Sequence, residues 1–306
     1  MGSRAFLILM PLIVAVFVGV VVVWGMSRSR ALVFDNDRYP GLVALRRVTV
    51  TSRYAGVAAG LAAFVVVAFV GPLGRGLFLA PSIAGAVLIL AVVIGQQLAY
   101  GSARASGTAG VERRLIRHYL PRGFSIAVLL ILALLLASAI WTTLAAGPDS
   151  LGLDRALTVK GSQAPIAATG SEAVIIESTR SPFPGSYYTS MLAMGLPIVL
   201  ALGAVALWLT ARRPRNGADP ELVAVDDVLR RQTAEGVVAA VGLAAGISLL
   251  LVGLSAALAL AGMTGYGARY AIGGAALGVA ALASLVVAAW CAVLLLVPGG
   301  GTVMAS

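Results

Sequence analysis

The sequence predicts an all-α, polytopic membrane protein, because its composition, its long apolar runs and the distribution of its basic residues agree. Of the 306 residues, 60% are hydrophobic and 11% are charged, whereas a soluble domain has roughly 25% charged residues. Several apolar runs have about the 20 residues that a helix needs to cross a hydrocarbon core of roughly 30 Å. Because lipid offers the backbone no hydrogen-bond partners, these runs are expected to be helices.

Seven runs are long enough to span a bilayer, which predicts seven transmembrane helices. They are Ala5–Met26, Tyr54–Val70, Leu77–Tyr100, Phe124–Ala146, Met191–Ala211, Gly236–Gly262 and Tyr270–Val297. The bilayer is therefore the first expected partner of the chain.

Basic residues are divided unequally between the two sides of these runs. The loops after the first, third and fifth runs contain 16 of the 22, and the opposite side contains six. The positive-inside rule then predicts an outside N-terminus and a cytoplasmic C-terminus in the plasma membrane. We expect the first run to be a retained anchor, because one Arg precedes it and six follow it. Only Lys160 is a lysine, which is typical of a high-GC bacterial genome.

Short segments recur in the same order in the two halves of the chain. The matched pairs are Met10–Val14 with Leu196–Leu200, Pro40–Ala44 with Pro220–Ala224, Gly56–Gly60 with Gly242–Gly246, and Ile83–Ala86 with Ile272–Ala275. We interpret them as a parallel 3+1+3 internal repeat. It divides the chain into a first three-helix unit (1–123), a linking helix (124–146), an extracytoplasmic loop (147–190) and a second three-helix unit (191–306).

This 3+1+3 plan, with an outside N-terminus and prolines at Pro11 and Pro197, is similar to the topology of the SWEET sugar transporters. The resemblance implies two parallel three-helix units joined by one helix. The chain has no Pro-Gln dipeptide of the PQ-loop kind, and its second and sixth runs have no interior proline. No functional residue is therefore carried over from that family.

The scarcity of reactive groups argues against catalysis. All 12 acidic residues lie outside the interiors of the predicted helices, and the chain has one His, His118, and one Cys, Cys291. No nucleophile–base pair, carboxylate pair or metal-ligand set can be assembled within the helices, so we expect no enzyme activity, no catalytic residue, no metal and no cofactor. The Arg-rich loops lack interleaved aromatic residues, which argues against nucleic acid as a partner.

Two sets of residues within the runs are candidates for a membrane site. Pro11, Pro197, Gln96 and Gln97 are candidate cavity or hinge residues, although the two glutamines suit an interhelical hydrogen bond equally well. The Gly-x-x-x-Gly pairs Gly56, Gly60, Gly242 and Gly246 are candidate helix-packing residues.

The segment after Asp219-Pro220-Glu221 has the signals of a helix start. We expect a short amphipathic helix that lies on the inner leaflet or docks a cytoplasmic partner. The candidate docking residues are Leu222, Val225, Leu229, Arg230 and Arg231. In the external segment, Leu157–Val159 and Ala173–Ile176 are expected to pair as strands that pack on the helix ends.

Two functions remain open. The first is a non-enzymatic membrane scaffold or accessory subunit that docks a cytoplasmic or membrane protein partner through its Arg-rich loops. The alternative is a permease or exporter for a neutral or apolar small molecule that uses the two similar halves for alternating access. A packed centre of the bundle favours the scaffold, and a cavity between the halves favours the permease.

Overall fold

The computed structural model describes residues 40–101, 119–163, 174–212, 220–263 and 266–297, and the protein is mostly helical in these ranges. Six helices in them are long and apolar enough to cross a membrane. They are α2 (Pro40–Ala68), α3 (Arg75–Gly101), α4 (Arg122–Ala145), α5 (Ser186–Arg212), α6 (Pro220–Ala261) and α7 (Ala268–Leu296). The chain is thus a multi-pass membrane protein. The predicted span Ala5–Met26 lies outside the described residues.

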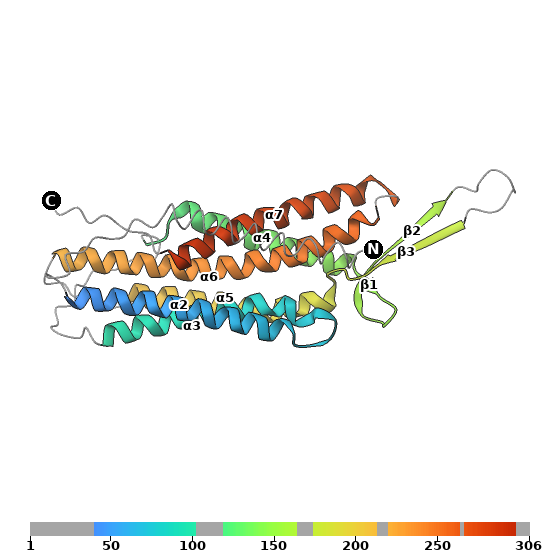
Figure 1. The fold of residues 1–306 in the computed structure, drawn as a ribbon. Coiled ribbons are helices and arrows are strands. Elements are labelled where there is room, and N and C mark those ends of the chain that lie inside the picture. The colour runs from blue at the N-terminus through green and yellow to red at the C-terminus, as the bar shows by residue number, and fades with distance from the viewer. Residues whose placement is uncertain (1–39, 102–118, 164–173, 213–219, 264–265, 298–306) are drawn as a thin grey trace.

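The helices lie side by side in an elongated bundle, and three short strands project from one end of it (Figure 1). We call this the hairpin end, because the α2–α3 and α6–α7 connections also lie there. At the opposite end, which we call the Arg end, α2 begins at Pro40 and α6 begins at Pro220. Successive described helices alternate in direction between the two ends.

The expectation of a separate amphipathic helix before the sixth span is wrong. A single helix, α6, runs from Pro220 to Ala261 without interruption. Likewise, α2 begins at Pro40 rather than near Tyr54. Both helices begin at a proline, which suits the first helical position, and both extend about four turns beyond the apolar run. Hydropathy detects the apolar part of such a helix and misses its polar start.

The core of the bundle is built around α6, the most deeply buried of the six spans. It packs on α7, α4, α3 and α5, while α2 packs mainly on α3. Alanine supplies much of the centre: Ala239, Ala240 and Ala245 are fully buried. Side chains this small let helix backbones approach closely, which favours association in lipid through van der Waals packing.

The segment between α4 and α5 forms an antiparallel three-stranded sheet of order β1-β2-β3, with strands β1 (Gly147–Pro148), β2 (Asp154–Gln163) and β3 (Val174–Arg180). Leu157 lies opposite Arg180 in the β2–β3 register. Two strands pair here as predicted, but Leu157–Val159 lies opposite residues 178–180 of β3, and residues 174–176 lie opposite residues 161–163 of β2. Leu157 also joins a buried cluster with Phe183 and with Met263 at the end of α6, so the sheet packs on the bundle, as expected.

Candidate functional site

Most hydroxyl groups inside the described helices bond to their own helix. Thr210 Oγ1 donates to the Ala206 carbonyl at 2.8 Å, and Ser284 Oγ donates to the Ala281 carbonyl at 2.8 Å. Such bonds are the usual local partners of Ser and Thr in a helix. Six buried side-chain atoms have no hydrogen-bond partner in the described part of the chain: Arg53 Nε, Arg75 Nε, Ser82 Oγ, Gln96 Nε2, Ser125 Oγ and Ser248 Oγ. The buried polar groups therefore do not form a continuous polar line through the bundle.

Two buried arginines join helices at the Arg end. A guanidinium nitrogen of Arg53, on α2, donates to the backbone carbonyl of Gln232 on α6. Arg230, also on α6, donates from Nη1 to the Thr210 carbonyl of α5 at 3.3 Å. Both arginines are almost fully buried. A charged donor strengthens such a bond, so these contacts tie the starts of α2 and α6 to the end of α5.

Burial divides the predicted docking residues. Leu229 and Arg230 are buried within the chain, whereas Arg231 is exposed and pairs with Glu235 at 3.0 Å. Leu222 and Val225 lie on the first turns of α6, where only the backbone is described. The expectation that Arg230 is presented to a partner is therefore corrected, because its guanidinium is used to bind α5.

The candidate cavity and hinge residues are not brought together in the structure. Pro197 lies inside α5 and is exposed. Gln96 is buried and Gln97 is exposed, both near the Arg end of α3. Gln96, Gln97 and Pro197 do not line either of the two cavities described below. Pro11 lies outside the described residues.

The four candidate packing glycines all lie against helices of the same chain. An added Cβ at Gly56 would lie 2.7 Å from the Cβ of Ala91 on α3. At Gly242 the added atom would lie 2.6 Å from Sγ of Cys291 on α7. The pair Gly56 and Gly60 thus packs on α3, and the pair Gly242 and Gly246 packs on α7.

One of the matched sequence segments does not occupy an equivalent place in the two hairpins. Gly60 lies against Ala84 of α3, but Gly246 lies against Ser284 and Ala288 of α7. Gly274, in the segment matched to Ile83–Ala86, instead lies against Leu260. The α6–α7 hairpin continues farther beyond its glycine pair than the α2–α3 hairpin does, which shifts the register of the third helix.

A cavity of about 500 Å³ lies between the two helix hairpins. It is lined by side chains of α2, α3 and α6 and by the end of α7, and its wall is almost entirely apolar. Small residues form much of the wall, including Gly60, Ala84, Gly85 and Ala244. A cavity of this size can hold an apolar molecule or part of another helix, but it offers no polar group to a charged substrate.

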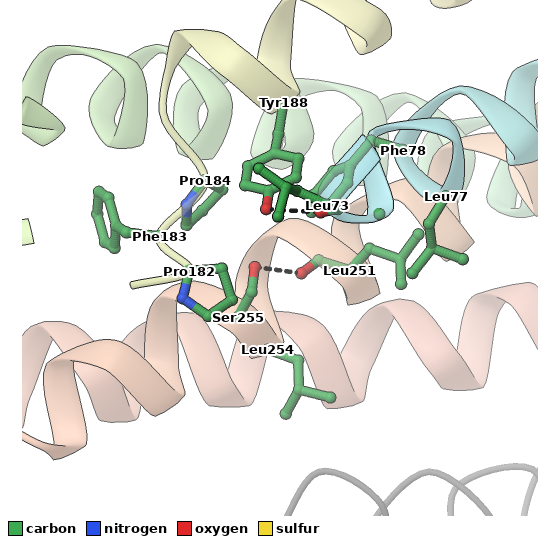
Figure 2. A pocket seen from close by; sticks show the side chains of 11 residues that line it. Leu73, Leu77, Phe78, Pro182, Phe183, Pro184, Tyr188, Leu251, Leu254 and Ser255 are labelled. Carbon is green, nitrogen blue, oxygen red and sulfur yellow. Dashed lines mark hydrogen bonds between the residues drawn. The ribbon is translucent and has the colours of Figure 1, made fainter. Parts of the chain in front are cut away.

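A second cavity, of about 210 Å³, lies at the hairpin end (Figure 2). Tyr188 and Phe78 line it and pack against each other with ring centroids 4.6 Å apart. Two polar groups at the cavity are already bonded: Tyr188 donates to the Leu73 carbonyl at 2.9 Å, and Ser255 donates to the Leu251 carbonyl at 2.6 Å. The cavity is therefore an apolar space under the loop of Pro182 and Pro184.

An ion pair holds the turn that leads into the sheet. Arg155 Nε lies 2.5 Å from an Asp149 carboxylate oxygen, and the amides of Leu151 and Leu153 donate to the other oxygen at 2.8 and 3.0 Å. Desolvation raises the pKa of Asp149, but the two amides and the Arg155 guanidinium outweigh it, so the pKa lies below its ordinary value. The carboxylate is thus held ionised as a structural group.

In the described ranges no three His, Cys, Asp or Glu side chains lie close enough together to hold a metal ion. The sequence reasoning missed Arg53 and Asp149, whose partners come from other segments. It also missed Pro81, which lies inside α3 and lines the larger cavity. The proline itself was visible in the third apolar run and could have marked that helix as unusual.

No protein-family model matches the chain, and neither a curated protein nor a solved structure is significantly similar to it.

Proposed function

We propose that the protein is a non-enzymatic scaffold or accessory subunit of the membrane, and that it docks a protein partner at its Arg end. The observation that carries this proposal is the packing of α6, where Ala239 and Ala245 are fully buried against neighbouring helices. Transport of a polar solute needs a polar route between the halves. In the described residues most buried hydroxyl groups bond to their own helices, and the bond between Thr143 of α4 and Thr189 of α5 joins a single pair.

Exposed charge at the Arg end supports the docking surface. Arg47 on α2 and Arg231 on α6 are both exposed, unlike Arg53 and Arg230 on the same two helices. Because buried arginines already bind backbone carbonyls, the exposed pair is the part of the proposed surface that can meet a partner. Charge of this kind gives specificity and speeds association more than it adds affinity.

We further propose that the Arg end faces the cytoplasm of a cell whose plasma membrane holds the protein, with the N-terminus outside. The alternating direction of the described helices supports a regular threading of the chain through the bilayer. The excess of basic residues in the loops at this end gives the orientation. In both the α2–α3 and the α6–α7 hairpin the glycine pair of the first helix packs on the second helix, which supports the 3+1+3 repeat, although the two hairpins differ in register.

Charge reversal at the exposed pair tests the docking surface. The double variant Arg47→Glu, Arg231→Glu is purified from the native host in a gentle detergent, and co-eluting proteins are quantified by mass spectrometry. We expect a stoichiometric partner to be lost from this variant but retained by Arg269→Glu, which reverses an exposed charge at the hairpin end. Equal recovery of the partner from both variants would contradict the proposal.

The cavity between the hairpins favours a second candidate, a permease for a neutral or apolar small molecule. Val57→Phe would narrow the cavity, and Val66→Phe adds the same bulk at an exposed position of α2 outside it. If the protein is a permease, the flux of a neutral solute into proteoliposomes should fall in Val57→Phe and persist in Val66→Phe. An absence of flux across a broad panel of neutral solutes would rule it out.

A further inference from the structure

The larger cavity is a groove at the seam where α2 and α7 face each other. Val57 and Leu61 of α2 form one side, and Leu296 of α7 forms the other. At the Arg end the two helices meet directly, because the Tyr54 hydroxyl donates to the Leu296 carbonyl at 2.9 Å. Beyond that contact the seam is open, and small residues of α3 and α6 form its floor.

A second seam of the bundle, between α3 and α6, is filled by α5. Gly195 of α5 lies against Ser82 of α3, where an added Cβ would be 2.6 Å from the serine Cβ. Gly203 of α5 lies against Val241 of α6, where the corresponding distance to Cγ2 is 3.0 Å. One helix with two small residues therefore fits closely between two helices from different hairpins.

The two seams are equivalent in the proposed internal repeat, in which the α2–α3 hairpin corresponds to the α6–α7 hairpin. The glycine pairs of α2 and α6 match each other in sequence at an offset of 186 residues, so exchanging the two hairpins takes α6 to α2 and α3 to α7. The counterpart of the α3–α6 seam is then the α2–α7 seam, which is the site of the groove. At the same offset, Leu196–Leu200 of α5 corresponds to Met10–Val14.

The segment around Met10–Val14 has the length and composition that the groove requires. Residues 5–26 are uncharged and apolar, and their 22 residues equal the 22 of the membrane-crossing part of α2, Arg47–Ala68. As a helix they would extend about 33 Å. Only 13 residues, 27–39, separate this segment from the start of α2, and they can reach about 45 Å at most. The segment must therefore lie within reach of α2.

We propose that residues 5–26 dock as a transmembrane helix in the groove between α2 and α7, in the place that α5 takes between α3 and α6. Small residues line the groove, with Gly60 on the α2 side and Ala84, Gly85 and Ala244 on the floor, and they allow the close backbone approach that binds helices in lipid. This inference does not depend on the proposed function. It would remove the space on which the permease candidate depends.

Disulfide crosslinking tests the docking. In a Cys291→Ala background, single cysteines between Ile8 and Val20 are paired with Leu61→Cys in the groove. Disulfides form only where Cα atoms come within about 7 Å, so we expect intramolecular crosslinks at positions three or four residues apart. Leu130→Cys, on the exposed side of α4, is the control and is expected to give none. If Leu61→Cys fails to fold, Val57→Cys on the same wall replaces it.

Three results would overturn the inference. Crosslinks to Leu130→Cys would place the segment on another face of the bundle. Crosslinks to Leu61→Cys only between two chains would show that a second copy covers the groove. Labelling of the groove by a photoactivatable phospholipid, without any crosslink to residues 8–20, would show that lipid fills it.

Discussion

Asp149 stabilises the entry to the sheet only while it is ionised. Its pKa is lowered in the folded protein, because two amides and Arg155 outweigh the opposing effect of desolvation. A carboxylate whose pKa is depressed by folding contributes stability above its unfolded-state pKa of about 3.9. That contribution is lost as the pH falls through the folded-state value.

We therefore expect Asp149→Asn to lower the Tm in detergent at neutral pH, and we expect the difference from the wild type to shrink below about pH 4. Thermal unfolding at several pH values measures it. Glu177→Gln removes an exposed carboxylate from the same sheet and should change Tm little. A difference between wild type and Asp149→Asn that stays constant down to acid pH would contradict this role.

Arg53 is the residue that joins the α2 start to α6. Arg53→Leu removes a charged donor to the Gln232 carbonyl, and loss of such a bond costs about 1.5–3 kcal/mol. We expect a clear fall in the free energy of unfolding, measured by denaturant titration in detergent micelles. Arg47→Leu, an exposed change on the same helix, should stay within about 0.5 kcal/mol of the wild type. Equal effects of the two changes would show that burial of Arg53 is unimportant.

At the scale of the helices, the two hairpins pack through glycines beside which an added Cβ would be crowded. Gly246→Ala would bring the new atom to 3.1 Å from both the Ser284 carbonyl and the Ala288 Cβ. Overpacking of this kind costs about 1–3 kcal/mol. Gly278→Ala, whose added Cβ would have its nearest neighbour at 3.9 Å, should be neutral or slightly stabilising.

The two alanine variants are compared by thermal unfolding in the same detergent. A lower Tm for Gly246→Ala together with an unchanged or higher Tm for Gly278→Ala is the expected result. If both variants melt together with the wild type, close packing of α6 on α7 is not a source of stability.

Element boundaries illustrate what the sequence could predict. Hydropathy located the six described spans, because an apolar run of sufficient length must be a helix in lipid. It placed the starts of the second and sixth spans near Tyr54 and Gly236, since it measures apolar composition and does not register a polar helical extension. Pro40 and Pro220 carried that information as helix-start signals.

The candidate site was less predictable, because its contacts join distant segments. The pattern around Arg230 is that of an isolated amphipathic helix, and nothing local indicates that its guanidinium binds the Thr210 carbonyl. Similarly, the groove between the hairpins depends on how α2, α3, α6 and α7 pack together. The glycine pairs can be located in the sequence, but which helices they contact is decided by the tertiary packing.

At the scale of the whole molecule, the account depends on a bundle centre closed to water. Ala240, Val199 and Cys291 belong to one buried cluster contributed by α6, α5 and α7. A permease for hydrophilic solutes would need water to enter this region during its cycle. A scaffold needs a stable frame that holds its docking surface in place.

The most direct measurement is the reactivity of Cys291 toward a charged, membrane-impermeant maleimide in native membranes opened on both sides. Cys291 is fully buried against Gly242, so we expect no labelling until the protein is denatured. The reference is Lys160→Cys in a Cys291→Ala background, whose thiol lies on the exposed sheet and should react fully. Labelling of native Cys291 at a rate comparable with this reference would contradict a packed centre and favour a water-filled route between the halves.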